Sequence, residues 1–244
     1  MKLIKQIWIW IRNIFLFLVL FSLIAVTGYK FIPVYYTPLM FIRAYEQHKA
    51  DKPVKIDHTW IPLDRIAQSL VQAVVASEDN LFLEHHGFDM DQIKKAQEEA
   101  EKGKRIRGAS TISQQTAKNV FLWPGKNYFR KGLEVYFTFL IEKIWGKERI
   151  MEVYLNSIEM GDGIYGAEAV ARAHFSKHAY ELDRSEAALI AATLPNPRQY
   201  NSAKPSAYII KRQIQISALM SKLAKINMGY GTDKNTNPQK TKTK

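Results

Sequence analysis

The chain opens with a long apolar segment. Residues 13–29 contain no charged side chain, and seventeen residues are at the short end of what an α-helix needs to cross a bilayer. Residues 7–11 and 31–36 can lengthen the span, because the charged head of Arg12 can reach toward the interface while its stem stays in apolar surroundings. We therefore predict a transmembrane anchor over 13–36.

The charges beside this segment predict its orientation. Lys2, Lys5 and Arg12 precede it, so the positive-inside rule places residues 1–12 in the cytoplasm as a short tail, and the rest of the chain outside. A cleaved signal peptide is the alternative, since the most apolar stretch, 14–26, is short enough for one. No good small-residue cleavage site follows that stretch. An uncleaved single-pass anchor is the preferred interpretation.

After the anchor, apolar positions recur at the three- and four-residue spacing of a buried helix face. Such stripes occupy residues 61–75, 129–145, 150–155, 187–194 and 206–228. The last stretch precedes Gly229, a residue type suited to the end of a helix. Because no convincing strand alternation is found, the pattern predicts a mainly α fold.

Two short motifs predict where helices begin. Thr111 and Gln114 have the spacing of a capping box, at the start of a helix that runs to about Asn119. Asp183 and Glu186 have the same spacing ahead of another apolar stripe. These motifs predict helix N-termini near residues 111 and 183.

The charge of the chain argues against a nucleic-acid partner. The net charge is +12, but residues 1–30 carry +4 and the last sixteen residues carry +3, which leaves +5 on the body. A body this mildly basic lacks the charge of a nucleic-acid surface. Residues 231–244 are polar and basic, and we predict that they form a disordered tail. The absence of cysteine excludes disulfides and Cys-ligated metal sites.

The first candidate for chemistry is a carboxylate at a predicted helix end. Glu78 follows the stripe over 61–75, where the partial negative charge of a helix C-terminus opposes ionisation. Partial burial would raise its pKa further, toward the range that suits a general base or acid. The alternative interpretation is an ordinary solvated turn.

A second candidate is an anion-binding helix. Thr111, Gln114, Gln115 and Lys118 lie at spacings of three and four, so they share one helix face. Ser110 and Thr111 sit at the helix N-terminus, whose free N–H groups favour an anion, and the Lys118 ammonium suits a phosphate. A diphosphate is the natural ligand of such a surface. The alternative is an exposed polar face.

A third cluster combines a carboxylate with cations. Arg130 and Glu134 stand four residues apart and Lys131 and Glu134 three apart on a predicted helix. Taken alone, this spacing is typical of a surface ion pair worth a few tenths of a kcal/mol. The functional interpretation is a carboxylate held ionised by two cations, facing a diphosphate site that includes Lys126.

In order, these motifs resemble those of the peptidoglycan glycosyltransferases, the bacterial transglycosylases. The pattern Glu-Asp-x-x-Phe-x-x-His-x-Gly is met by Glu78, Asp79, Phe82, His85 and Gly87. The other three patterns are met by residues 108–119, by Arg130, Lys131 and Glu134, and by residues 154–166. The resemblance covers about residues 40–225, and we predict a glycosyltransferase domain over 40–230. The tail is too short for a transpeptidase domain, so the chain resembles the monofunctional biosynthetic form.

The resemblance implies a lysozyme-like helical enzyme that polymerises lipid II into β-1,4 glycan with inversion. Glu78 would be the general base on the acceptor hydroxyl, and Glu134 would assist on the leaving side. The donor would be bound by Ser110, Thr111, Gln114, Gln115, Lys118, Asn119, Lys126, Arg130 and Lys131. Asp79, Phe82, His85 and Gly87 would hold the loop of Glu78. For an inverting reaction we expect the two carboxylates to lie at least about 6.5 Å apart.

The implied partners are lipid II, the lipid-linked glycan, membrane lipids and other cell-wall synthesis or division proteins. The implied location is the bacterial inner membrane, with a periplasmic catalytic domain. The resemblance admits a divalent cation (Mg²⁺ or Mn²⁺), although no dedicated ligand cluster is visible. Residues 121–123 suit an interfacial position beside the bilayer or, equally, a core-packed loop.

The chain departs from the family pattern at four positions, Lys126, Thr138, Ile141 and His174, and two rival functions remain. Lys126 replaces a frequent arginine, which would reduce a forked phosphate contact to a point charge. His174 replaces an aromatic residue. A peptidoglycan hydrolase or lytic transglycosylase could share the fold, but it would not need a diphosphate site. A non-enzymatic membrane-anchored scaffold would not need the Glu78 and Glu134 pair.

Overall fold

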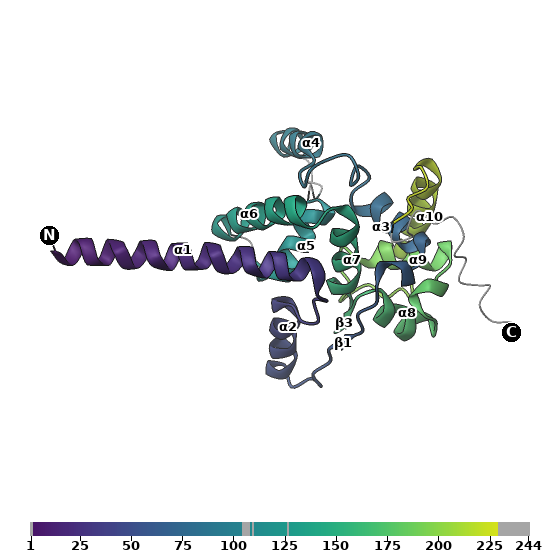
Figure 1. Ribbon diagram of the computed structural model, residues 1–244. Helices are drawn as coiled ribbons and strands as arrows, with labels where there is room; N and C mark the ends of the chain where they lie inside the picture. The colour runs from purple at the N-terminus through teal and green to yellow at the C-terminus, as the bar shows by residue number, and fades with distance from the viewer. Residues whose placement is uncertain (1, 104–107, 109, 126, 229–244) are drawn as a thin grey trace, which may run out of the picture.

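The computed structural model describes residues 2–103, 108, 110–125 and 127–228. Within these residues the fold is mainly helical, as predicted (Figure 1). The helices after the first are α2 (Pro38–Lys49), α3 (Gln68–Glu78), α4 (Met90–Glu101), α5 (Ile112–Phe121), α6 (Tyr128–Ile144), α7 (Lys147–Ser157), α8 (Ala167–Phe175), α9 (Arg184–Thr193) and α10 (Ala207–Lys222). Short 3-10 turns lie at Leu63–Arg65 and Ala179–Glu181.

The apolar N-terminal segment forms one long helix, α1 (Lys2–Phe31), that projects from the body (Figure 1). Its 30 residues would span about 45 Å at 1.5 Å per residue, more than the thickness of a hydrocarbon core. The helix includes most of the predicted cytoplasmic tail and stops before residue 36. It stops there because Pro33 cannot continue a helix and the chain runs extended to Pro38, where α2 begins.

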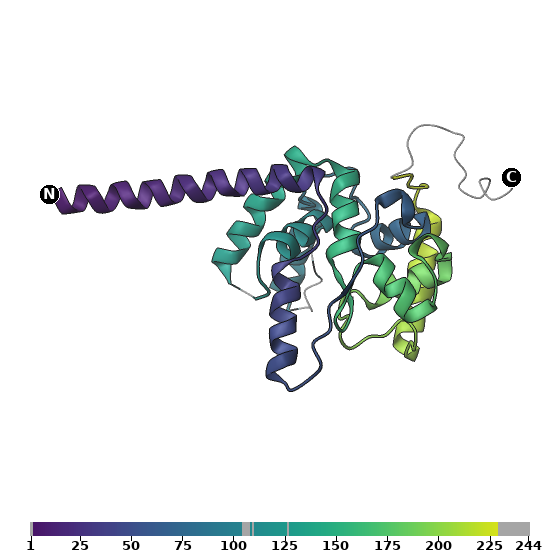
Figure 2. The same cartoon turned by 60° about the horizontal axis from the view of Figure 1, so that its bottom comes forward.

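The last turns of α1 are fastened to the body. The indole N–H of Trp145 donates to the Val26 carbonyl at 2.7 Å. The Arg149 guanidinium donates to the Tyr29 carbonyl at 2.7 Å, which satisfies a C-terminal carbonyl that the helix leaves unpaired. In both views α2 then turns away from the α1 axis (Figures 1 and 2). The C-terminal end of α1 is therefore held against the part of the body that α5, α6 and α7 form.

The body core forms between helices that are distant in sequence. The stripe of α3 packs against α9 and α10, while α5 packs against α6 and α7. Tyr154, Phe82 and Leu70 are among its largest fully buried side chains. This packing brings the C-terminal end of α3, which carries Glu78, next to α5.

Two predicted helices are too long. The stripe over 61–75 predicted a helix from residue 61, but a 3-10 turn at Leu63–Arg65 comes first and α3 begins only at Gln68. The stretch 206–228 was expected to be helical throughout, but α10 ends at Lys222. The reason is tertiary: the Gln68 amide donates to the Met228 carbonyl at 2.6 Å and accepts from the Met228 N–H at 3.2 Å. The chain leaves the helix to bury Met228 against α3. Gly229, the expected helix end, lies outside the described residues.

A small sheet was not predicted. It consists of β1 (Asp57–His58), β3 (Ile164–Tyr165) and β2 (Glu159–Gly161) in that order, parallel between β1 and β3 and antiparallel between β3 and β2. Strands of two or three residues are too short to show alternation in a sequence. Gly166 follows directly, with φ +83° and an added Cβ only 2.6 Å from the Asn156 carbonyl oxygen, so only glycine fits.

Candidate active site

Glu78 is the last residue of α3, as its position after the apolar stripe predicted. The Gln115 amide donates to Glu78 Oε2 at 3.0 Å, and the Tyr154 hydroxyl donates to Gln115 Oε1 at 3.3 Å. Although Glu78 keeps some solvent exposure, the packed protein around it raises its pKa. The Gln115 hydrogen bond and the charges of Arg212 and Lys118 oppose this increase. The result is a carboxyl group with the properties of a general base.

Asp79 ties the end of α3 to the start of α5. Its Oδ2 accepts from the Ile112 N–H at 2.9 Å, and its Oδ1 lies 2.8 Å from His85 Nε2. Because His85 Nδ1 accepts from the Gly87 N–H at 3.1 Å, Nε2 carries the ring proton and donates to Asp79. This chain of bonds holds the loop after Glu78.

Phe82 is fully buried in the same loop, and the Lys147 ammonium lies 4.6 Å from its ring centre. The Thr111 hydroxyl donates to the Gly87 carbonyl at 2.7 Å, so the loop is fixed to α5 at a second point. Both contacts place Phe82 and Gly87 in support of the site, outside the cleft itself.

Gly87 is required by its conformation and its surroundings, which leads to a stability prediction. Its φ is +91°, and an added Cβ would lie 2.9 Å from Thr138 Cγ2 and 3.0 Å from Glu142 Cγ. We expect Gly87→Ala to lower the free energy of unfolding by about 1–3 kcal/mol through strain and overpacking. Denaturant unfolding of the full chain in detergent measures this change.

The matched control is Gly132→Ala, in the interior of α6. Nothing lies within 4 Å of the Cβ that this substitution adds, and alanine is the better helix former. We expect it to leave the stability unchanged or raise it by about 0.5–1 kcal/mol. Equal effects of the two substitutions would contradict the role assigned to Gly87.

The start of α5 contains the predicted capping box. The Thr111 hydroxyl accepts from the Gln114 N–H at 3.1 Å, and the Gln114 side chain accepts from the Thr111 N–H at 3.0 Å. Both side chains are only 3% exposed. Their polar groups are used inside the fold and line neither pocket of the adjoining cleft, and the expectation that they contact a substrate stays a prediction. They orient the helix that presents Gln115, Lys118 and Asn119 to the cleft.

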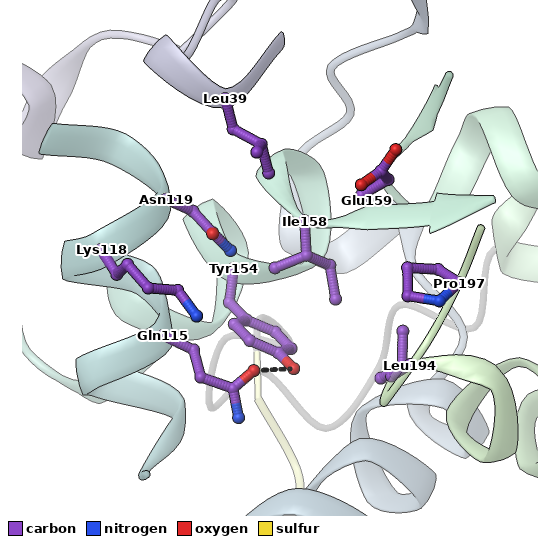
Figure 3. Close-up of a pocket in the computed structure, with 9 residues that line it drawn as sticks. All are labelled: Leu39, Gln115, Lys118, Asn119, Tyr154, Ile158, Glu159, Leu194 and Pro197. Carbon is purple, nitrogen blue, oxygen red and sulfur yellow. Dashed lines mark hydrogen bonds between the residues drawn. The ribbon is translucent and has the colours of Figure 1, made fainter. Parts of the chain in front are cut away.

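Two adjoining pockets form the cleft. The first, here named the Tyr154 pocket, is lined by Leu39, Gln115, Lys118, Asn119, Tyr154, Ile158, Glu159, Leu194 and Pro197 (Figure 3). The second, the Arg130 pocket, is lined by Leu39, Arg43, Ser110, Lys118, Asn119, Leu122, Trp123, Pro124, Gly125, Arg130, Lys131 and Glu134. Lys118 and Asn119 line both, so a single ligand can extend from one pocket into the other. Lys126 lies outside the described residues.

The Arg130 pocket concentrates positive charge around one buried carboxylate. Arg130 donates to Glu134 Oε2 at 2.6 Å and Lys131 to Oε1 at 2.5 Å. The side chains of Arg130 and Glu134 are 9% and 3% exposed, so the interpretation as a solvated surface pair is wrong. Burial lowers the pKa of Lys118, and the charges of Arg130 and Lys131 add to this decrease. With Arg43, four basic side chains line this pocket against one carboxylate, which favours an anionic ligand.

Comparison with known proteins agrees with this arrangement. A family model described as Transglycosylase matches residues 46–221. The chain belongs to the transglycosylase family. It is 59% identical over 223 residues to the biosynthetic peptidoglycan transglycosylase of Bacteroides thetaiotaomicron. This alignment covers 91% of this chain and 90% of the relative.

Two further relatives carry the same name. The biosynthetic peptidoglycan transglycosylase of Caulobacter vibrioides is 52% identical over 203 residues, covering 83% of this chain and 86% of the relative. That of Bdellovibrio bacteriovorus is 51% identical over 207 residues, covering 85% and 83%. Each alignment therefore spans more than four fifths of both chains.

Sequence reasoning missed two residues of this transglycosylase site. Arg212, from α10, lowers the pKa of Glu78, and its Nε is buried without a hydrogen-bond partner among the described residues. A signal for Arg212 existed, since it lies on the buried stripe formed by Ile209, Ile216 and Met220. Glu159 lines the Tyr154 pocket from β2, and an acidic residue just before a glycine-rich turn gave no signal.

The described residues do not fit a resident divalent cation. No group of three or more His, Asp or Glu side chains is placed to hold one in the part of the chain that the structure describes. Both oxygens of Glu134, the carboxylate in the Arg130 pocket, are paired with Arg130 and Lys131. We therefore derive no step through a metal.

Proposed function

We propose that this protein is a membrane-anchored peptidoglycan glycosyltransferase that polymerises lipid II. The reaction joins a lipid-linked glycan donor to a lipid II acceptor through a β-1,4 bond, with inversion and release of undecaprenyl diphosphate. The family match and the names of the relatives support the reaction class. The observation that carries the mechanism is the Glu78 carboxyl group of raised pKa, which accepts a hydrogen bond from Gln115 of the Tyr154 pocket. The charge of Lys118, which also lines the cation-rich Arg130 pocket, acts on this carboxyl group.

Glu78 is the general base in this proposal. It takes the proton of the acceptor 4-hydroxyl while that oxygen attacks the donor anomeric carbon and the bond to the diphosphate breaks. The Gln115 amide, held by the Tyr154 hydroxyl, orients the Glu78 carboxylate. Proton transfer to a positioned base contributes roughly 10²–10⁴-fold to such a rate.

The Arg130 pocket binds the leaving diphosphate. Lys118, Arg130 and Lys131 place positive charge where negative charge develops, the kind of stabilisation that contributes most to a difficult departure. Ser110 and Asn119 line the same pocket and supply polar contacts. Glu134 holds two of these cations, Arg130 and Lys131, in place through its ion pairs with them.

The proposed location is the bacterial inner membrane, with α1 as its anchor and the catalytic domain in the periplasm. Lys2, Lys5 and Arg12 at the start of α1 support this orientation. The proposed partners are membrane lipids and other cell-wall synthesis or division proteins. Within residues 121–123, Phe121 stacks on Phe137 with ring centres 4.6 Å apart and Leu122 is buried, which supports core packing of these two residues. Trp123 is 39% exposed, which suits an interfacial position.

The test is a polymerisation assay on the purified full chain in detergent with lipid II. The expected product is a ladder of glycan polymer on a gel, together with undecaprenyl diphosphate. A peptidoglycan hydrolase would instead release soluble fragments from preformed glycan, and a scaffold would bind lipid II without turnover. Either of these results would overturn the proposal.

The raised pKa of Glu78 predicts the pH dependence of the reaction. A general base must be ionised, so kcat/KM is expected to fall as the pH drops through the raised pKa of Glu78. The acidic limb should therefore lie above the ordinary glutamate pKa of about 4.3. Initial rates of polymerisation between about pH 4.5 and pH 9 locate this limb. A profile that stays flat down to the ordinary value would argue against Glu78 as the base.

A further inference from the structure

The Tyr154 pocket contains a buried carboxylate that the proposed chemistry does not use. Glu159, in β2, is 8% exposed, and its Oε1 has no hydrogen-bond partner among the described residues. The other oxygen, Oε2, accepts from Arg43 Nε at 3.3 Å. A buried acceptor without a partner has lost its hydrogen bonds to water and gained none in the fold, which is unfavourable. A polar group that is kept at this cost inside a binding cleft points to a ligand.

The surroundings of Glu159 act on its ionisation in both directions, and the net effect is a raised pKa. Burial is the largest influence and raises its pKa, while the charges of Arg43 and Arg198 oppose the increase. The backbone N–H of Gly163 also opposes the increase in the pKa of Glu159. It does not have the geometry of a hydrogen bond to Oε1. Oε1 is therefore an acceptor that a hydroxyl or an amide N–H of a ligand can pair.

The position of Glu159 relates it to the donor substrate. Figure 3 shows it across the Tyr154 pocket from Lys118, with the apolar side chains of Leu194 and Pro197 nearby. Lys118 also lines the Arg130 pocket, where the diphosphate lies in the proposed function. A sugar joined to that diphosphate extends past Lys118 into the Tyr154 pocket. Sugar rings have apolar faces and hydroxyl or acetamido donors, and this pocket offers both kinds of contact.

We propose that Glu159 is a substrate-binding residue whose Oε1 accepts a hydrogen bond from a hydroxyl or acetamido N–H of a sugar unit in the lipid-linked donor. This inference rests on the proposed function and adds a sugar contact to it. The competing account is structural: Glu159 would only hold β2 to α2 through Arg43.

The variant Glu159→Gln separates these accounts. The glutamine oxygen can still accept from Arg43. The glutamine NH₂ group then occupies the place of Oε1, where it cannot accept a hydrogen bond from the sugar. We expect the KM for lipid II to rise about tenfold or more, because hydrogen bonds to charged groups are worth about 1.5–3 kcal/mol. The kcat and the thermal midpoint are expected to stay near the wild-type values. A lower thermal midpoint with an unchanged KM would overturn the proposal in favour of the structural account.

The matched control is Glu46→Gln. Glu46 accepts from Arg43 at 2.7 Å and from Arg198 at 3.3 Å, so it perturbs the same arginines. Its side chain is 43% exposed, and it is not among the residues that line either pocket. We expect a wild-type KM, and a rise equal to that of Glu159→Gln would overturn the proposal.

The wild-type assay distinguishes the two levels of inference. If the wild-type protein does not polymerise lipid II, the proposed function fails, and the sugar contact fails with it. If the wild-type protein polymerises lipid II and Glu159→Gln has the wild-type KM, the sugar contact alone fails.

Discussion

Replacing Glu78 with glutamine is expected to reduce glycan polymerisation by about 10²–10⁴-fold, the contribution of a positioned general base. Glutamine has nearly the same shape as glutamate. Its oxygen can still accept the hydrogen bond that Gln115 Nε2 donates to Glu78 Oε2 at 3.0 Å in the wild type. It cannot take the proton of the acceptor hydroxyl. The measurement is the rate of lipid II consumption, followed by sizing of the products on a gel.

The stability of Glu78→Gln provides its control. Because the folded-state pKa of Glu78 is raised, the folded chain holds more protons than the unfolded chain between the two pKa values. Wild-type stability therefore falls as the pH rises through that window, and it stays lower above the raised pKa. Glutamine carries no charge, so the variant should be at least as stable as the wild type at neutral pH. A variant that is both inactive and unstable would show a loss of folding, and full activity in the variant would remove Glu78 from its role.

Replacing Glu134 with alanine is expected to cost about 3–5 kcal/mol of folding free energy, because it leaves a buried cation without its partner. Arg130 is 9% exposed at its side chain and contacts Glu134 Oε2 at 2.6 Å. The Arg130 pocket should lose its geometry as well, so polymerisation should fall even at temperatures where the variant is folded. Denaturant unfolding and the lipid II assay measure the two effects separately.

Lys131→Ala is the matched comparison for this prediction. Lys131 contacts the other oxygen of Glu134, but its side chain is 45% exposed. Water screens an ion pair of this kind, so its loss should cost no more than about 1 kcal/mol. If Glu134→Ala and Lys131→Ala were destabilised equally, the buried Arg130 left without its partner would not be the source of the cost.

Local patterns predicted the elements that carry the site. The stripe over 61–75 placed Glu78 at a helix end, and α3 ends at that residue. The spacing of Thr111 and Gln114 predicted the start of α5, because a capping box is made within one turn. The spacings among Arg130, Lys131 and Glu134 predicted their ion pairs, since residues three and four apart meet on any helix.

What these patterns could not show is which of the same side chains face the substrate. Thr111 and Gln114 turn inward, and the pair Arg130–Glu134 is buried, because segments distant in the sequence pack over them. Arg212 and Glu159 join the site from α10 and β2 for the same reason. Hydrogen bonding along a helix depends on neighbours within about four residues, so the chain encodes it locally. Burial and the convergence of charges depend on contacts between remote segments, and they exist only once the chain has folded.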